Sequence, residues 1–132
     1  MDLEEQALSY PDSIYSIARG SSMSSLSETA FITIVDATLA RLAGMVEAMD
    51  SEDVLEVEQT SGMLTIEMPS GKQFVLNRQI PTRQIWLSSP LSGGLRFDYD
   101  EDEKLWKLPD SRRLDTLLKA DLETLLEDEV EA

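Results

Sequence analysis

The chain has 132 residues, 42% of them hydrophobic, which suits one small globular domain with a single modest core. It contains no cysteine and no histidine, which excludes disulfides, thiolate metal sites and the usual general base, and leaves only oxygen ligands for a bound metal. The net charge of −15 and the lack of a run of ~20 apolar residues exclude nucleic acid and membranes as expected partners, and favour cations or basic proteins.

The charge is unevenly distributed along the chain. Residues 1–58 carry 12 acidic and 2 basic side chains, and residues 98–132 carry 13 acidic and 5 basic ones. Between them, residues 59–97 carry one acidic side chain, Glu67, and four basic ones. A mildly basic segment therefore lies in the middle of an acidic chain.

The first half of the chain divides into an extension and a helix. Residues 1–25 end in a Gly/Ser run typical of a linker, and we expect a flexible N-terminal extension there. Residues 27–49 repeat apolar side chains at steps of three and four, which predicts an amphipathic helix with Ser27 as its N-cap.

Short strand patterns follow, separated by turn residues. They cover residues 54–58, 62–68, 72–77, 83–89, 94–99 and 104–108. A leucine-rich stripe over 112–127 predicts a second helix, capped by Asp110 or Ser111, and residues 128–132 read as an acidic tail. We therefore predict an α+β fold: a two-layer α-β sandwich, with an antiparallel sheet of about five to six strands and two helices on one face.

Two groups of residues are candidates for binding. The first is acidic and lies on the first helix, its C-terminal end and the first strand, where carboxylates either hold a divalent cation weakly or form a solvated face. It comprises Glu28, Asp36, Glu47, Asp50, Glu52, Asp53, Glu56 and Glu58.

The second group surrounds Trp86 in NRQIPTRQIWLSSP, residues 77–90. Strand alternation places Trp86 on the same face as Gln84 and Ser88, opposite Ile85 and Leu87. A tryptophan on a polar face is either an interface anchor or a side chain covered by a loop of its own domain. Its neighbours in the meander are Asn77, Gln79, Arg83 and Arg96.

Conventional catalytic machinery is missing from the sequence. There is no phosphate-binding glycine loop and no Ser/His/Asp set, and the carboxylates lie among other carboxylates rather than in apolar surroundings. An interaction protein is therefore favoured over an enzyme.

The run from Gly62 to Tyr99 carries a more specific signal. It closely resembles the frataxin family, whose pattern N-[KR]-Q-x-P-x-[KR]-Q-I-W-L-S-S-P-x-S-G is matched from Asn77 to Gly93. The resemblance covers about residues 26–127, which we take as the domain, and its WLSSPLSG form is similar to the eukaryotic, mitochondrial branch.

This resemblance implies a role in iron–sulfur cluster assembly in the mitochondrial matrix, in which the protein binds the cysteine desulfurase and the scaffold protein and stimulates sulfur transfer. It implies weak binding of iron (Fe²⁺/Fe³⁺) at surface carboxylates, and a monomer or an iron-dependent oligomer. The matching metal contacts are Glu28, Asp36, Glu47, Asp50, Asp53 and Glu56. The matching partner contacts are Asn77, Gln79, Gln84, Trp86 and Arg96.

An alternative implied by the same resemblance is an iron chaperone or weak ferroxidase that stores or donates Fe²⁺. The first helix departs from the family's acidic pattern, because alanine or glycine stands at several usually acidic positions and Arg41 adds a positive charge. The loop DEDEK, residues 100–104, is more acidic than is typical, and is either a further cation contact or a solvated hairpin. These departures weaken the iron-handling hypothesis more than the partner-binding one.

Overall fold

The computed structural model describes residues 26–131, so the expected extension over 1–25 lies outside it. The first helix, α1 (Glu28–Met49), begins where predicted, and the Ser27 hydroxyl accepts a hydrogen bond from the Ala30 amide at 3.1 Å. This bond satisfies one of the free amides of the first turn, so the predicted N-cap is confirmed.

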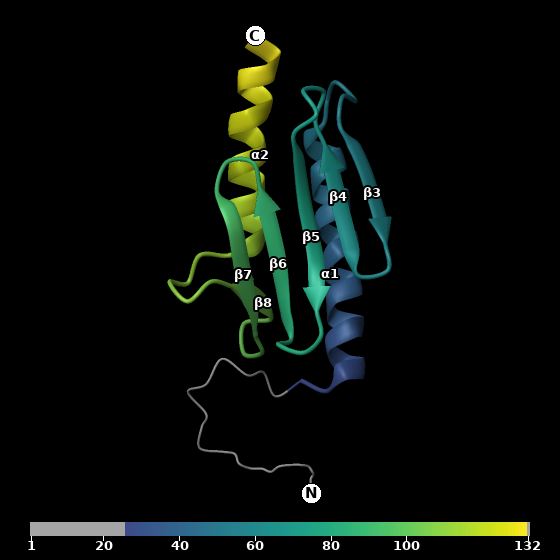
Figure 1. Ribbon diagram of the computed structural model, residues 1–132, viewed down its shortest axis with the longest axis vertical. Helices are drawn as coiled ribbons and strands as arrows, with labels where there is room; N and C mark the ends of the chain where they lie inside the picture. The colour runs from purple at the N-terminus through teal and green to yellow at the C-terminus, as the bar shows by residue number, and fades with distance from the viewer. Residues whose placement is uncertain (1–25, 132) are drawn as a thin grey trace, which may run out of the picture.

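Six strands follow α1 and form one antiparallel sheet (Figure 1). They pair with their neighbours in chain order, so the sheet is a simple meander without crossovers. The strands are β3 (Glu56–Thr60), β4 (Met63–Glu67), β5 (Gln73–Gln79), β6 (Gln84–Ser89), β7 (Gly93–Asp100) and β8 (Leu105–Lys107).

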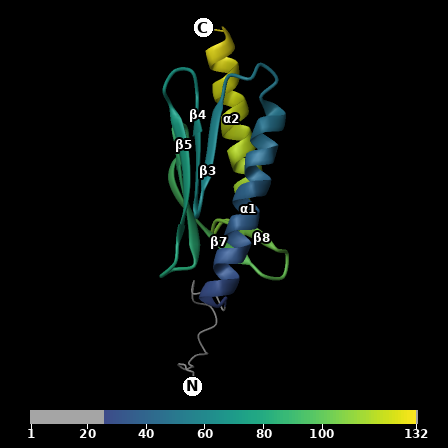
Figure 2. The ribbon, with the colours of Figure 1, turned by 90° about the vertical axis from the view of Figure 1, so that its right-hand side faces the viewer.

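Both helices cover the same face of this sheet, as Figure 2 shows edge-on. The second helix, α2 (Leu114–Glu131), lies beside α1, and the core between the layers includes Phe31, Phe74, Phe97 and Trp106. The predicted α+β sandwich is therefore confirmed. By length and composition α1 is apolar enough to cross a membrane, but its apolar stripe is buried against the sheet, as a core helix requires.

The ends of α2 differ from the prediction. The helix begins at Leu114, and the Asp110 carboxylate instead accepts the Arg112 amide in the preceding turn, so the predicted cap is wrong. At its other end α2 continues beyond residue 127 to Glu131. The Glu129 carboxylate there accepts hydrogen bonds from the amide and hydroxyl of Ser70 in the β4–β5 turn, which ties this stretch to the sheet layer.

Candidate functional site: the outer face of the sheet

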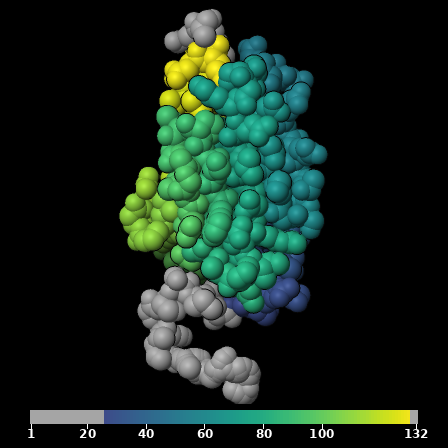
Figure 3. Space-filling view, in the orientation of Figure 1, coloured from purple at the N-terminus to yellow at the C-terminus, as the bar shows by residue number. Residues whose placement is uncertain are grey.

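The face of the sheet that the helices leave uncovered carries an unbroken row of side chains. Cross-strand pairing sets Met63 opposite Asn77, Asn77 opposite Trp86, and Trp86 opposite Arg96. Figure 3 shows this face toward the viewer, as a broad surface over β4 to β7. We call it the outer face; side chains meet directly across it because opposite residues in antiparallel strands point the same way.

Trp86 lies at the centre of this row and is half-buried. Its indole N–H donates a hydrogen bond to the Gln84 side-chain oxygen at 3.0 Å, and the Arg96 guanidinium stacks over the ring, 4.5 Å from its centroid. Ile85 and Leu87 lie beneath it in the core, at 0% and 2% exposure. The sequence prediction that Trp86 faces away from the core is confirmed, and its polar atom and ring face are held by neighbours of the same surface.

The other predicted contacts join the same network. Gln84 donates from its amide nitrogen to an Asp98 oxygen at 3.1 Å, and Gln79 donates to the Asn77 side-chain oxygen at 3.0 Å. Gln79 also lies opposite Gln84 in the β5–β6 register. The fold therefore brings Asn77, Gln79, Gln84, Trp86 and Arg96 together on one surface.

Two members of this surface were missed in the sequence. Asp98 shares the Arg96 face of β7, and Met63 is 41% exposed beside Asn77. Strand alternation contains the signal for Asp98, which lies two residues from Arg96 on the same strand, whereas Met63 is placed on this face by the pairing of β4 with β5.

Two of the three arginines predicted to make this region basic lie away from the outer face. Arg78 pairs in register with the buried Ile85, so it lies on the inner face, where its guanidinium approaches the Asp36 carboxylate to 3.9 Å. Arg83 has a left-handed backbone (φ 54°) in the β5–β6 turn and donates to the carbonyls of Leu26 and Ile80. Placing Arg83 beside Trp86 was therefore wrong, and Arg96 is the arginine that the outer face keeps.

The predicted metal contacts are placed differently. Three of them lie on α1, at Glu28, Asp36 and Glu47. The steps of eight and eleven residues between them correspond to about 12 and 16 Å along the helix axis. These residues are therefore too far apart to bind one ion together. The Asp50 carboxylate accepts the amides of Val54 and Leu55, both at 2.9 Å, and so fixes the loop that leads into β3.

The six predicted metal contacts also differ in their exposure to solvent. Glu28, Glu47, Asp53 and Glu56 are exposed, and Asp36 and Asp50 are half-buried. Within residues 26–131, no group of three or more His, Cys, Asp or Glu side chains lies close enough to hold a metal ion. The six carboxylates form a dispersed acidic surface rather than an assembled coordination site.

Two of the carboxylates in the acidic loop after β7 are paired with an ammonium of the adjoining strand β8. The Asp100 carboxylate accepts the amides of Asp102 and Glu103, and the Lys107 ammonium contacts both Asp100 and Glu103, at 3.4 and 2.5 Å. The Glu103 amide is the main reason that the pKa of Asp100 lies below its ordinary value, and hydrogen bonding to Glu103 raises the pKa of Lys107. Asp100 and Glu103 are therefore already occupied by an ammonium of the protein, which makes them poorer candidates for a cation contact.

One further acidic feature lies on the outer face itself. Glu56 on β3 is directly opposite Glu67 on β4, and Glu58 is two residues along the same face. We call Glu56, Glu58 and Glu67 the acidic edge. Like charges placed opposite one another are destabilising, so this edge favours a positively charged partner.

Comparisons with known proteins agree on one family. A frataxin-like domain model matches residues 24–128. The iron-sulfur cluster assembly protein CyaY of Pseudomonas putida strain GB-1 is 40% identical over 90 residues, which cover 68% of this chain and 79% of that protein. The CyaY protein of Pseudomonas fluorescens strain Pf0-1 is 40% identical over 82 residues, 62% and 72% of the two chains.

Solved structures show the same relationship. Yeast frataxin superposes with a TM-score of 0.62 at 30% identity, over 78% of this chain and 85% of that one. A trimeric frataxin from Saccharomyces cerevisiae complexed with ferrous iron gives a TM-score of 0.60 at 32% identity, over 69% and 83%.

Proposed function

Because this chain belongs to the frataxin family, we propose that it acts in iron–sulfur cluster assembly by binding the cysteine desulfurase and the scaffold protein and stimulating sulfur transfer to the scaffold. Relatives named for iron-sulfur cluster assembly support the pathway. The partners and the stimulation are what the resemblance to the frataxin family implies, and the surface chemistry supports them.

The observation that carries this proposal is the state of Trp86. A tryptophan with its N–H bonded to Gln84 and its ring stacked under Arg96 already has a fixed orientation, so little side-chain entropy is lost when a partner covers it. Tryptophan and arginine at the centre of a surface are the residues most often found as interface hot spots. We assign the outer face around Trp86 to the scaffold protein.

The acidic edge serves the second partner. Exposed carboxylates accelerate encounter with a basic surface and select against acidic ones. We assign this edge, with the exposed carboxylates of α1, to a basic surface of the desulfurase. Since the sequence contains no conventional catalytic set, we propose that the protein favours the state of the complex that is competent for sulfur transfer, which is a population shift.

The test is reconstituted cluster assembly with desulfurase and scaffold, with and without this protein, at controlled iron. Trp86→Ala should lower the stimulation at least about tenfold, the usual size of a hot-spot loss, while urea unfolding remains cooperative. Thr65→Ala, on the same outer face at β4, is the matched control and should stimulate normally. Normal stimulation by Trp86→Ala would refute the assignment of the outer face.

Iron handling is the second candidate, supported by the ferrous complex of the trimeric yeast relative and by the exposed carboxylates here. An iron chaperone or weak ferroxidase requires that Fe²⁺ perturb the amide resonances of residues 28, 36, 47, 50 and 53–58. It also requires that neutralising these side chains abolish iron transfer in an assay free of desulfurase. Sedimentation with and without Fe²⁺ tests the proposed monomer and iron-dependent oligomer.

We also propose that the protein works in the mitochondrial matrix. The proposal is supported by the eukaryotic form of WLSSPLSG, whereas the curated relatives described above are bacterial. Fractionation of source cells followed by detection of the native protein tests it, and recovery outside the mitochondrial fraction would contradict it.

A further inference from the structure

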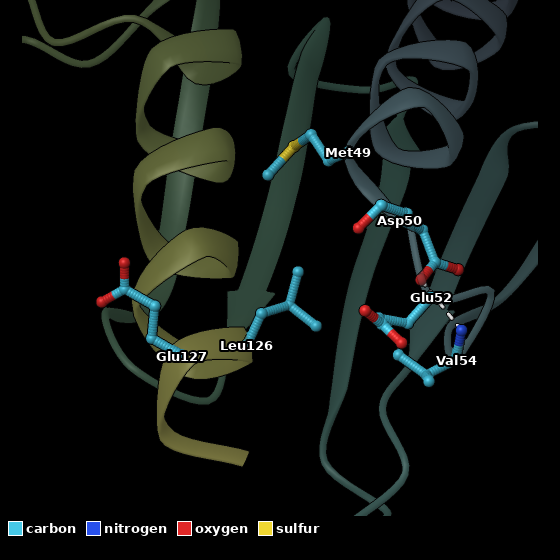
Figure 4. Close-up of a pocket in the computed structure, with 7 residues that line it drawn as sticks. Met49, Asp50, Glu52, Val54, Leu126 and Glu127 are labelled. Atoms are coloured by element: carbon cyan, nitrogen blue, oxygen red, sulfur yellow. Dashed lines mark hydrogen bonds between the residues drawn. The ribbon is translucent and has the colours of Figure 1, made fainter. Parts of the chain in front are cut away.

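A pocket of about 250 Å³ opens between the C-terminal ends of α1 and α2, apart from the outer face. Figure 4 shows Leu126 of α2 on one side, with Met49 at the end of α1 and Val54 in the following loop across from it. The rest of the lining consists of Asp50, Ser51, Glu52 and Glu127. The pocket is thus built from two helix ends and one loop.

The chemistry of the pocket is apolar inside and acidic around it. Met49 and Leu126 pack against the core, and Val54 is 38% exposed, an unusual state for a large apolar side chain here. Asp50 is occupied by the backbone amides of its own loop. Neither Glu52 nor Glu127 is paired with a cation in the part of the chain that the structure describes.

We propose that this pocket binds a single apolar side chain, of leucine or phenylalanine size, presented by a basic peptide segment of a partner protein. Drug-sized ligands occupy cavities of about 300–1,000 Å³, so this smaller pocket fits one side-chain anchor better than a whole cofactor. The carboxylates of Glu52 and Glu127, with no cation among the lining residues, attract lysine or arginine on either side of that anchor.

Residues 1–25 fit the pocket poorly as an intramolecular occupant. The 22 residues of α1 place the pocket about 33 Å from the end of the helix that residues 1–25 join (Figure 1). The basic residue of that segment, Arg19, is seven residues from Leu26, which reaches at most about 25 Å when fully extended. The remainder of the segment contributes four acidic side chains.

A second copy of the chain is also disfavoured as the occupant. Each copy carries a formal charge of −15, so pairing would bring two strongly acidic molecules together. A basic partner, in contrast, is attracted by the negative charge of this chain. The pocket is separate from the outer face, so a variant that loses peptide binding at the pocket can still bind a partner at the outer face, and the reverse.

The experiment uses the full ¹⁵N-labelled chain and two peptides that carry fluorescein at the N-terminus, fluorescein-Lys-Arg-Leu-Arg-Lys-amide and its Leu-to-Ser counterpart of equal charge. The leucine peptide should bind about 30-fold more tightly than the serine peptide, as burial of one leucine side chain predicts. It should shift the amides of Met49, Val54 and Leu126. Equal binding of the two peptides, or shifts confined to the acidic edge, would overturn the proposal.

Surface variants separate the pocket from general charge. Glu52→Gln combined with Glu127→Gln should weaken the leucine peptide about tenfold at low salt, whereas Glu58→Gln combined with Glu123→Gln, an equal charge change elsewhere, should leave it within about twofold. Equal weakening by both pairs would contradict binding at the pocket.

Two further measurements test the other occupants. If Ile14→Ser shifts the pocket amides in the free protein, residues 1–25 are the occupant. If those amides shift when the protein is diluted, a second copy of the chain is the occupant. Either result overturns the proposal.

Discussion

The buried carboxylate of Asp121 should be one of the strongest single contributors to stability outside the apolar core. It is 7% exposed on α2, and one of its oxygens accepts the hydroxyls of Ser89 and Ser92 at 2.8 and 2.6 Å. The Ser89 oxygen in turn accepts the amides of Leu91 and Ser92. The loop between β6 and β7 is therefore closed on α2 through one acidic side chain.

The magnitude follows from these bonds. A hydrogen bond to a charged group contributes about 1.5–3 kcal/mol, and Asp121→Ala removes two, so we expect a loss of about 3–6 kcal/mol in the free energy of unfolding. With a urea m value of about 2 kcal/mol/M, the middle of the range for small proteins, the midpoint of unfolding should fall by about 1.5–3 M. Ser89→Ala should cost more than Ser92→Ala because it also removes the acceptor of two loop amides.

The assay is urea unfolding followed by far-UV circular dichroism, with the exposed Glu123→Ala on the same helix as control. That control should stay within about 0.5 kcal/mol of the wild type. A loss below about 0.5 kcal/mol for Asp121→Ala, or a larger loss for Ser92→Ala than for Ser89→Ala, would refute the reasoning.

Three further predictions concern other polar contacts. Thr38→Val keeps the side-chain shape but leaves the buried Trp106 indole N–H without its acceptor, so thermal unfolding should show a loss of about 1–3 kcal/mol. Glu129→Gln weakens the hold of α2 on the β4–β5 turn, and amide hydrogen exchange should accelerate at the end of α2 but not in α1. The pKa of Asp100 is lower in the folded protein than in the unfolded chain, so the ionised carboxylate stabilises the fold at pH values above its unfolded pKa. This stabilisation is lost as the pH falls through the folded pKa. Asp100→Asn should therefore be less stable than wild type at pH 7 and equally stable near pH 2.

Much of the fold could be predicted because the apolar side chains repeat with two characteristic periods, one typical of helices and one typical of strands. The three- and four-residue steps of α1 and the alternation around Trp86 each assign side chains to a face without knowledge of distant contacts. The position of Ser27 before the apolar stripe fixed the start of α1 for the same local reason. The outer face followed from alternation alone.

The contacts that could not be predicted join residues far apart in the chain. Arg78 lies on the inner face because β5 continues to Gln79, two residues beyond the predicted end, and pairs Arg78 with Ile85. Asp121 contacts Ser89 across 32 positions, which no local pattern contains. A clue was present, since Asp121 interrupts the leucine stripe of α2 and an acid on an apolar face needs a partner.

The arrangement of β6 explains why recognition and stability can be altered separately in this protein. Ile85 and Leu87 fill the core on one side of the strand, and Trp86 lies on the other, held by side chains of β6 and β7. Removing Trp86 leaves the core intact, whereas shortening Leu87 opens a cavity beneath a correct surface. A rigid sheet backed by a packed core also keeps the outer face in its binding shape before a partner arrives, which lowers the entropic cost of docking. For the binding role that we propose, this preorganisation is what the sheet contributes to a complex.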